Sequence, residues 1–595
     1  MTHVDVQTQQ SRINTEMSIH AHMARNSKLK KSAYALDPQS ISGCQRSENW
    51  ESPAQGNSWK ASILTEVNNL IKYGVYVVVD ASEARDKKIF PSLINFLTKR
   101  TKDSTPESEK IDKRKTRICF GGHRCVLGED YTKVDSYAPV PTWSAIKIQL
   151  ALTAIHGMKL KAFDACAAYL QTPIDKEMYV RPPPGLMGLL GKDPSAIWKL
   201  QKVLYGYPRG AFLWYQKLFT YLKAYGFRTL GNSATFLMLD RRDDPDCPGM
   251  ILMNVYSDDG LASTSSESLW NKFMVDFKKN FDIEEKDPDY FLGAAIRQTE
   301  SGSIILDPSK YLREVAAKYD MSQAVTTSLP LPPGSKLYMN DSDDNECTHD
   351  ETNLYQQMAG SVMYASLLRP SVMYYASQLG KVMSRPNHEH MRKARQVIQY
   401  LNSTADEVMT FRPAGCDGWS QADVQLLAFS DSDWACAVDT RRSHGCHVIM
   451  LAGAAVAWRS RSHKSVMLST AGAEYYEASE ACREIAYVRS ILADYYGTEL
   501  RPTPLLIDNA AAIAMGQMPQ FTEKQKHIPI RICHLKECCT DGMVELWPVS
   551  TRNEIADIGT KALTQEPFDR LNSVMMGRQR ISALLDSDPN FSGKF

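Results

Sequence analysis

The sequence predicts a multidomain protein of the α/β and α+β classes, and three features of the chain support this fold class. Its 595 residues are enough for several domains of ordinary size. Segments with helical apolar spacing alternate along the chain with short β-branched runs. A Pro- and Gly-rich stretch from Ser328 to Lys336 interrupts this pattern and predicts a boundary between units.

Composition limits the classes of protein to consider. Hydrophobic residues make up 43% and charged residues 23% of the chain, and no apolar run is long enough to span a bilayer, so we expect no membrane partner. The first residues lack the order of a signal peptide, which predicts a cytoplasmic location with most of the 13 cysteines as free thiols. The net charge of +1 does not by itself indicate nucleic-acid binding.

One local charge run is an exception. Between Arg85 and Arg117 there are eleven Lys or Arg against five Asp or Glu. Such a surplus could contact phosphates, or it could form a solvated face.

The first folded unit is expected over residues 49–330. Residues 1–48 are polar without sustained periodicity, which indicates a disordered segment or a polyprotein remnant. From Trp59 a helical pattern leads through Gly74 into a β-branched strand. A second helix, WSAIKIQLALTAIH, is opened by Thr142 as N-cap and closed by Gly157, and a short strand then carries Asp164.

Three further segments follow. Residues 331–424 are predicted as a linker and a helical connection, with DSDDNECTHDE as an exposed loop and NHEHMRKARQVIQYL as the clearest helix. Residues 425–565 read as strand, hairpin, helix, strand, helix, strand and helix, the last helix being NEIADIGTKAL. Residues 566–595 are predicted as a C-terminal tail.

Two adjacent acids in the first unit have strands on both sides. Asp258 and Asp259 lie in ILMNVYSDDGLAST, which predicts a hairpin with carboxylates at its tip. Two-metal phosphoryl transfer needs carboxylates from separate segments, and Asp164 at the end of another strand meets that need. Taken alone, Asp164 could simply end a strand.

The order of motifs around these acids carries a resemblance. DxxxAYL, MYVRPPPG, LYG with WY, YSDD and YFLG resemble the palm of copia-type reverse transcriptases. The resemblance implies a right-hand polymerase of fingers, palm and thumb over residues 49–330, with Asp164, Asp258 and Asp259 as its catalytic, metal-binding triad. It also implies that Tyr169 excludes a ribose 2′-hydroxyl, and that Lys115 and Arg117 neutralise the incoming triphosphate.

One nucleotide-binding position departs from that family. The family pattern LYGLKQAPRAWY reads LYGYPRGAFLWY here, so Arg209 replaces a Gln beneath the nucleotide, and RICFGG replaces RLVAKG. An Arg offers five donors, no acceptor and a fixed charge. We expect Arg209 to be drawn to the triphosphate or to the nearby carboxylates, and to weaken polymerisation.

A second acidic set lies at element boundaries of residues 425–565: Asp431, Glu474, Asp508 and Asp557. Glu474 begins an apolar stripe at helical spacing through Ala478 and Ile485, which predicts that its carboxylate points inward. Alone, Glu474 could be an acid favoured by a helix N-terminus. Four acids on a small sheet suit two divalent metals.

The motifs SDSDWA, STAGAEY, IDNAAAI, KHIPIR and NEIADIGTKAL resemble, in order, the ribonuclease H region of copia-type elements. The resemblance implies a ribonuclease H-like mixed sheet with helices, in which these four acids are catalytic and bind metal. Gly472 replaces a family Glu without changing the expected ligands. His527 lies either near the nucleic acid or in a structural role, and neither CHLKECC, Cys533 to Cys539, nor HEH at 388–390 has the spacing of a zinc motif.

Together the resemblances imply an RNA-directed DNA polymerase with ribonuclease H activity from a retrotransposon Pol polyprotein. The expected cofactors are two Mg²⁺ or Mn²⁺ ions per active site. The expected partners are an RNA template, a DNA primer, an RNA–DNA hybrid and deoxynucleoside triphosphates, in the cytoplasm, within virus-like particles or after nuclear entry. The alternative is a catalytically degenerate or repurposed nucleic-acid-binding remnant of such an element.

Overall fold

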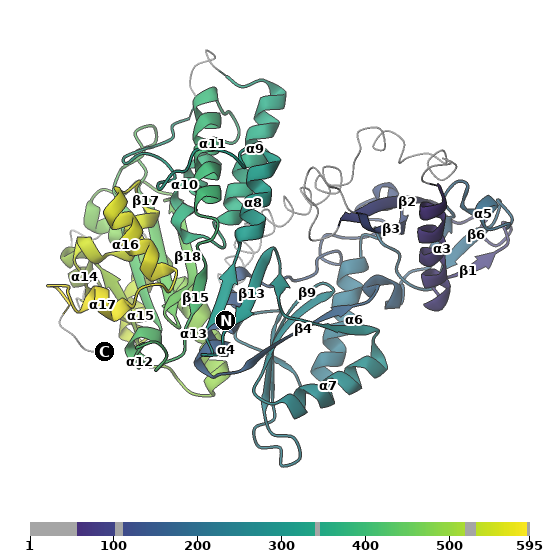
Figure 1. Ribbon diagram of the computed structural model, residues 1–595, viewed down its shortest axis with the longest axis horizontal. Coiled ribbons are helices and arrows are strands. Elements are labelled where there is room, and N and C mark those ends of the chain that lie inside the picture. Colours follow the sequence, from purple (N-terminus) through teal and green to yellow (C-terminus); the bar gives the residue numbers. More distant parts are fainter. Residues whose placement is uncertain (1–55, 101–110, 340–345, 518–530, 592–595) are drawn as a thin grey trace.

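The computed structural model describes residues 56–100, 111–339, 346–517 and 531–591. Its strands form sheets of five, six, four and five strands, each accompanied by helices. Figure 1 shows an elongated arrangement, with the N-terminal strands at one end and the yellow C-terminal helices at the other. The predicted multidomain α/β and α+β class is confirmed.

The N-terminal sheet has the order β1-β6-β5-β2-β3 and is covered by helix α3. Ile63, Val67 and Leu70 on one face of α3 are buried in its core. Gly74, at a φ of +61°, turns the chain from α3 into β1, as the sequence predicts. The elements are α3 Gly56–Lys72, β1 Tyr76–Val79, β2 Ile89–Arg100, β3 Ile111–Phe120, β5 Tyr179–Arg181, α5 Leu186–Leu189 and β6 Ile197–Leu200.

The central sheet has the order β11-β4-β10-β9-β8-β7 and is packed on both faces. Ile251 and Met253 on β9 join the core beneath α6 and α7, whereas Leu252 joins the core beneath α4, because successive side chains of a strand alternate. The Thr142 hydroxyl caps α4 as predicted, by accepting a hydrogen bond from the Ala145 N–H at 3.1 Å. The elements are α4 Trp143–Ile155, β4 Lys159–Ala165, α6 Gly210–Tyr225, β7 Arg228–Thr229, β8 Phe236–Asp240, β9 Met250–Tyr256, β10 Asp259–Thr264, α7 Glu267–Asn280 and β11 Ile283–Lys286.

The third sheet, β12-β13-β14-β15, joins segments that lie on either side of the predicted boundary. Strand β14 pairs with β15, and Leu331 and Leu337 of the Pro-rich stretch are buried in the same core as both. The stretch is therefore packed, and the boundary predicted at residue 330 does not separate two cores. The elements are β12 Tyr290–Phe291, β13 Ala294–Gln298, β14 Ile304–Asp307, α8 Ser309–Lys318, α9 His349–Ala365, α10 Met373–Lys381, α11 His388–Ser403 and β15 Met409–Phe411.

The C-terminal sheet has the order β18-β17-β16-β19-β20 and is mixed. Strands β16, β17 and β18 are antiparallel, whereas β19 pairs in parallel with β16 and β20. The long helix α13 packs on this sheet. The elements are α12 Gln421–Val424, β16 Leu427–Asp433, β17 His444–Leu451, β18 Ala454–Ser462, α13 Thr470–Tyr496, β19 Thr503–Ile507, α14 Ala510–Gln517, α15 Arg531–Thr540, β20 Val544–Pro548, α16 Gln565–Met575 and α17 Ile581–Leu585.

Three local predictions are corrected. The segment NEIADIGTKAL forms a short 3₁₀ turn, Ile555–Gly559, because the Glu554 carboxylate accepts a hydrogen bond from the Ala556 N–H and the Thr560 hydroxyl donates to Asp431. The predicted tail is folded over its described residues, 566–591, since α16 and α17 bury an apolar face in the core. The segment DSDDNECTHDE was predicted as an exposed loop, but its last residues form the start of α9 at His349, and its Cys347 is buried.

Two of the sequence predictions concern residues that the structure does not describe. These are the N-terminal segment 1–48 and His527. The cysteines of the described segments are free thiols. In these same segments no helix combines the length and the apolar character needed to cross a bilayer.

A buried histidine makes the C-terminal sheet sensitive to acid. Burial lowers the pKa of His444 from 6.5 to about 3, so the unfolded chain binds this proton more readily than the folded one. The stability that His444 contributes is present above pH 6.5 and is lost as the pH falls toward 3. We expect the stability difference between the parent and His444→Gln to shrink by about 1.4 kcal/mol per pH unit below pH 6.5. Urea unfolding of both proteins at pH 7, 6, 5 and 4 measures this difference in the free energy of unfolding. A difference that does not change with pH would contradict the prediction.

Candidate functional site: two acidic clusters on separate sheets

The first acidic cluster forms where the β9–β10 hairpin meets β4. Asp259 lies directly opposite Asp164 on β4 and opposite Tyr256 on β9, and the backbone oxygen of Asp258 accepts a hydrogen bond from Ala165 N–H at 2.8 Å. Ser257 closes the two-residue turn at a φ of +58°. The fold thus brings together three acids that are far apart in the sequence.

A lysine from β11 lies between these carboxylates. Lys286 Nζ is 2.7 Å from Asp164 Oδ1 and 3.7 Å from Asp259 Oδ1. Burial, and then the charge of Asp258, raise the pKa of Asp259 to about 7, while Lys286 opposes the shift. The three carboxylates attract cationic charge, and they could hold divalent metal with Lys286 displaced. Sequence reasoning missed Lys286, because only the pairing of β11 with β4 places it there.

Two predicted nucleotide-binding residues lie near the hairpin. The ring of Tyr169, in the 3₁₀ turn Ala168–Gln171, is 5.7 Å from the ring of Tyr205, over which the Arg117 guanidinium lies at 4.8 Å. Burial raises the pKa of Tyr169, and the charge of Asp258 adds to the shift. Lys115 precedes Arg117 by two residues on β3 and therefore lies on the same face of that strand.

Arg209 has other partners than expected. It occupies the N-cap position of α6, where its Nη1 forms an ion pair with Asp175 and its Nε lies 3.4 Å from Asp135. The expectation that its charge is drawn to the carboxylates of the triad is corrected. Asp135 and Asp175 neutralise it instead, and neither aspartate belongs to a motif that the sequence analysis selected.

Arg209→Gln is therefore expected to lower stability by about 1–2 kcal/mol, between the values for exposed and buried ion pairs. The reason is that Arg209 is only 12% exposed and that Asp135 and Asp175 lose their shared cation. Thermal melting measures the loss, and the double variant Arg209→Gln/Asp175→Asn should recover part of it. An unchanged melting temperature in the single variant would show that the pairs contribute nothing.

The second acidic cluster lies at one end of the C-terminal sheet. Asp431 on β16, Glu474 on α13 and Asp508 just after β19 each present an oxygen atom within 4.8 Å of the others. The parallel pairing of β16 with β19 places the ends of these strands side by side. Asp557, in the turn Ile555–Gly559, shares a hydrogen bond with Asp431.

The charges of this cluster are not balanced. Burial, followed by the charges of Asp431 and Asp508, raises the pKa of Glu474 to about 11. Burial and Asp431 likewise raise the pKa of Asp557 to about 8, although Lys561 Nζ lies 2.7 Å from its Oδ1. Within the described residues, Glu474 Oε2 is buried without a hydrogen-bond partner. Oxygen donors of this kind fit divalent cations.

Neighbouring residues position these acids. The Thr560 hydroxyl donates to Asp431 Oδ2 at 2.5 Å, and the Thr551 hydroxyl donates to Asp508 Oδ2 at 2.8 Å. Glu554 is fully buried, and burial, with Asp431 and Asp508, raises its pKa. Sequence reasoning selected only Asp557 from this segment. Glu554, Thr560 and Lys561 lie in the same motif, NEIADIGTKAL, and this could have identified them as neighbours of the cluster.

One region of the chain matches a known protein family. Residues 73–333 match the family model described as "Reverse transcriptase (RNA-dependent DNA polymerase)". This match includes the N-terminal sheet, the β9–β10 hairpin and the three aspartates of the first acidic cluster. The reverse transcriptase resemblance predicted from the motifs is therefore confirmed.

The curated relatives confirm the resemblance to copia-type Pol polyproteins. The chain is 26% identical over 465 residues to the retrovirus-related Pol polyprotein from transposon RE1 of Arabidopsis thaliana, covering 78% of this chain and 30% of the relative. It is 25% identical over 519 residues to the corresponding polyprotein from transposon TNT 1-94 of Nicotiana tabacum, covering 86% and 37%. The chain thus spans about a third of the length of these relatives.

A solved structure, the foamy viral protease-reverse transcriptase in complex with double-stranded DNA, matches with a TM-score of 0.44 and 12% identity. The match covers 83% of this chain and 70% of that one.

Proposed function

We propose that this chain is an RNA-directed DNA polymerase with ribonuclease H activity. The hairpin cluster would extend a DNA primer on an RNA template with deoxynucleoside triphosphates. The C-terminal cluster would cut the RNA strand of an RNA–DNA hybrid. The observation that carries the proposal is the presence of two separate acidic clusters, one within a matched reverse transcriptase region and one on a mixed sheet.

The polymerase assignment is supported by the arrangement around Asp259. Asp164 is its partner across the sheet and Asp258 precedes it, and Arg117 and Tyr169 both lie beside the ring of Tyr205. A guanidinium there can bind triphosphate oxygens. Tyr169 would lie against the sugar, where its ring leaves no room for a 2′-hydroxyl.

The ribonuclease H assignment is supported by Asp431, Glu474, Asp508 and Asp557. The unpartnered Glu474 Oε2 and the raised pKa of Glu474 indicate that Lys561 alone does not balance the negative charge of these four carboxylates. At either cluster, two Mg²⁺ or Mn²⁺ ions would activate the attacking oxygen and stabilise the leaving oxygen. Thr560 and Thr551 would hold Asp431 and Asp508 in position.

A nucleic-acid-binding remnant without polymerase activity is the second candidate. The departures at Arg209 and in RICFGG favour it, because the family resemblance implies a nucleotide-binding role for both segments. The ion pairs of Arg209 with Asp135 and Asp175 weaken this argument, because they keep its charge away from the triad.

Primer extension on an RNA template tests the polymerase. Asp258→Asn is expected to reduce extension by more than about 100-fold, because losing a metal ligand costs more than losing a group that merely positions one. Asp243→Asn is the matched control, since Asp243 is an exposed aspartate in the loop before β9. A folded parent that binds template and primer but extends no primer with either ion would favour the remnant.

A further inference from the structure

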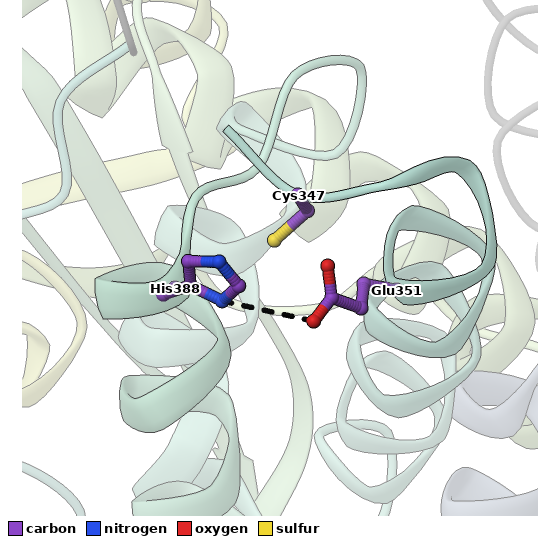
Figure 2. Close-up of side chains that lie close together, drawn as sticks. All are labelled: Cys347, Glu351 and His388. Carbon is purple, nitrogen blue, oxygen red and sulfur yellow. Dashed lines mark ion pairs between the residues drawn. The ribbon is translucent and has the colours of Figure 1, made fainter. Parts of the chain in front are cut away.

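Three possible metal ligands of different types meet far from both acidic clusters in the sequence. Cys347 precedes α9, Glu351 lies in the first turn of α9, and His388 is the first residue of α11. One atom of each lies within 4.8 Å of the others, and Glu351 Oε1 is 3.9 Å from His388 Nδ1. Figure 2 shows the three side chains pointing toward one another from the ends of two helices.

The backbone holds these ends together. Residues Glu346 and Asn387 form an isolated antiparallel bridge, and the Cys347 N–H donates to the Pro386 oxygen at 3.3 Å. The Arg385 guanidinium also pairs with Glu346 at 2.8 Å. The two segments that carry the ligands are therefore fixed against each other before any ion binds.

Both helices begin with a capping box, which fixes their first turns. Thr348 caps α9 together with Glu351, and Asn387 caps α11 together with His390. Glu351 uses only Oε2 in its box, where it accepts from the Thr348 N–H and hydroxyl, each at 2.9 Å. Its Oε1 remains directed at His388.

Helix capping does not account for the cysteine. Cys347 is 8% exposed and is not in a disulfide. Burial, and then the charges of Glu351 and Glu346, raise the pKa of this thiol. A thiol, a carboxylate and an imidazole are three side-chain types that bind zinc in proteins, and here they converge on one point.

We propose that Cys347, Glu351 and His388 bind one Zn²⁺ ion, with water in the fourth position. A thiolate and an imidazole favour zinc over magnesium, and the thiolate and carboxylate together balance its charge. Zinc–ligand distances of about 2.0–2.3 Å place tetrahedral ligand atoms roughly 3.3–3.7 Å apart. The observed 3.9 Å between Glu351 and His388 needs only a small closure.

The bound ion would tie α9 to α11, two helices that pack against each other and stand at the top of Figure 1. Sequence spacing did not reveal this site, because its ligands come from two helix starts and not from one motif.

Zinc binding to the full chain in excess Mg²⁺ tests the proposal, with Co²⁺ as a spectroscopic probe. The parent should bind one Zn²⁺ that Mg²⁺ does not displace, and Co²⁺ should give a thiolate charge-transfer band. Cys347→Ser and His388→Ala should each weaken Zn²⁺ binding at least about tenfold and reduce the Co²⁺ band.

Two matched controls should bind as the parent does. His349→Ala changes an exposed histidine in the same first turn, and Cys416→Ser changes a half-buried cysteine elsewhere. Glu351→Gln keeps the size of the side chain and provides a second loss-of-ligand variant if Cys347→Ser fails to fold. Parent-like zinc affinity in the folded ligand variants, or a Co²⁺ spectrum without a thiolate band, would overturn the site.

Discussion

Asp508→Asn is expected to lower the rate of RNA-strand cleavage in an RNA–DNA hybrid by more than about 100-fold, while primer extension continues. Asp508 shares the C-terminal cluster with Asp431 and Glu474, and Asn keeps its shape but removes its charge. The hairpin cluster lies on a different sheet, so the substitution should not reach it.

The same substitution should not unfold the protein. Burial and Asp431 raise the pKa of Asp508, so its charge is unfavourable in the absence of metal. We expect a melting temperature without Mg²⁺ that is equal to or above that of the parent, and a smaller rise on adding Mg²⁺. Asp541→Asn, at an exposed aspartate between α15 and β20, should match the parent in both assays. Hybrid cleavage that persists in Asp508→Asn would rule out this cluster as the nuclease site.

Glu477→Ala is expected to destabilise the C-terminal sheet by about 3–5 kcal/mol, the range for breaking a buried charged pair. Glu477 lies on α13 and is completely buried. Its Oε1 is 2.7 Å from His447 Nδ1, and its Oε2 is 3.0 Å from His463 Nε2. Burial alone would raise the pKa of Glu477, but these two hydrogen bonds outweigh it and hold the pKa well below its usual range.

The loss has two physical parts. Removing the carboxylate leaves two buried imidazole N–H groups without an acceptor, at about 1–3 kcal/mol each. It also opens a cavity beside Gly445, which the Glu477 side chain approaches closely. Glu477→Gln should cost less, since the amide fills the space and one oxygen still accepts.

Urea unfolding followed by a signal from the C-terminal sheet measures this effect. Glu499→Ala, at an exposed residue after α13, is the control and should change stability by less than about 0.5 kcal/mol. Hybrid cleavage should also fall in Glu477→Ala, because Glu474 is one turn away on the same helix. A Glu477→Ala protein as stable as the control would mean that the two histidines find other partners.

Acidic residues at the ends of apolar runs were the main sequence feature from which the two acidic clusters were predicted. Strand-like runs that end in carboxylates predicted the hairpin at Asp258, and one helical stripe predicted that Glu474 faces inward. Thr142 and Gly157 predicted the ends of α4 to within two residues. These features are local, because capping, turn formation and amphipathic spacing depend on neighbours within a few positions.

Partners distant in the sequence were decided only by the tertiary structure. Lys286 reaches the triad because β11 pairs with β4, and Arg209 is neutralised by Asp135 and Asp175, which no motif selected. Strand β15 joins β14 across the predicted boundary, so domain limits read from composition did not match the cores.

The sequence alone therefore predicted most of the elements, the resemblance to reverse transcriptases and the acids that the fold gathers into clusters, but not the 3₁₀ turn Ile555–Gly559 or the C-terminal helices. Tertiary structure decided which charges meet, including the joining of Cys347 and Glu351 to His388. The physical reason is that periodicity and capping report how each segment folds on itself. The electrostatic environment of a side chain depends instead on which segments pack around it. That packing is determined by the burial of apolar surface over the whole protein.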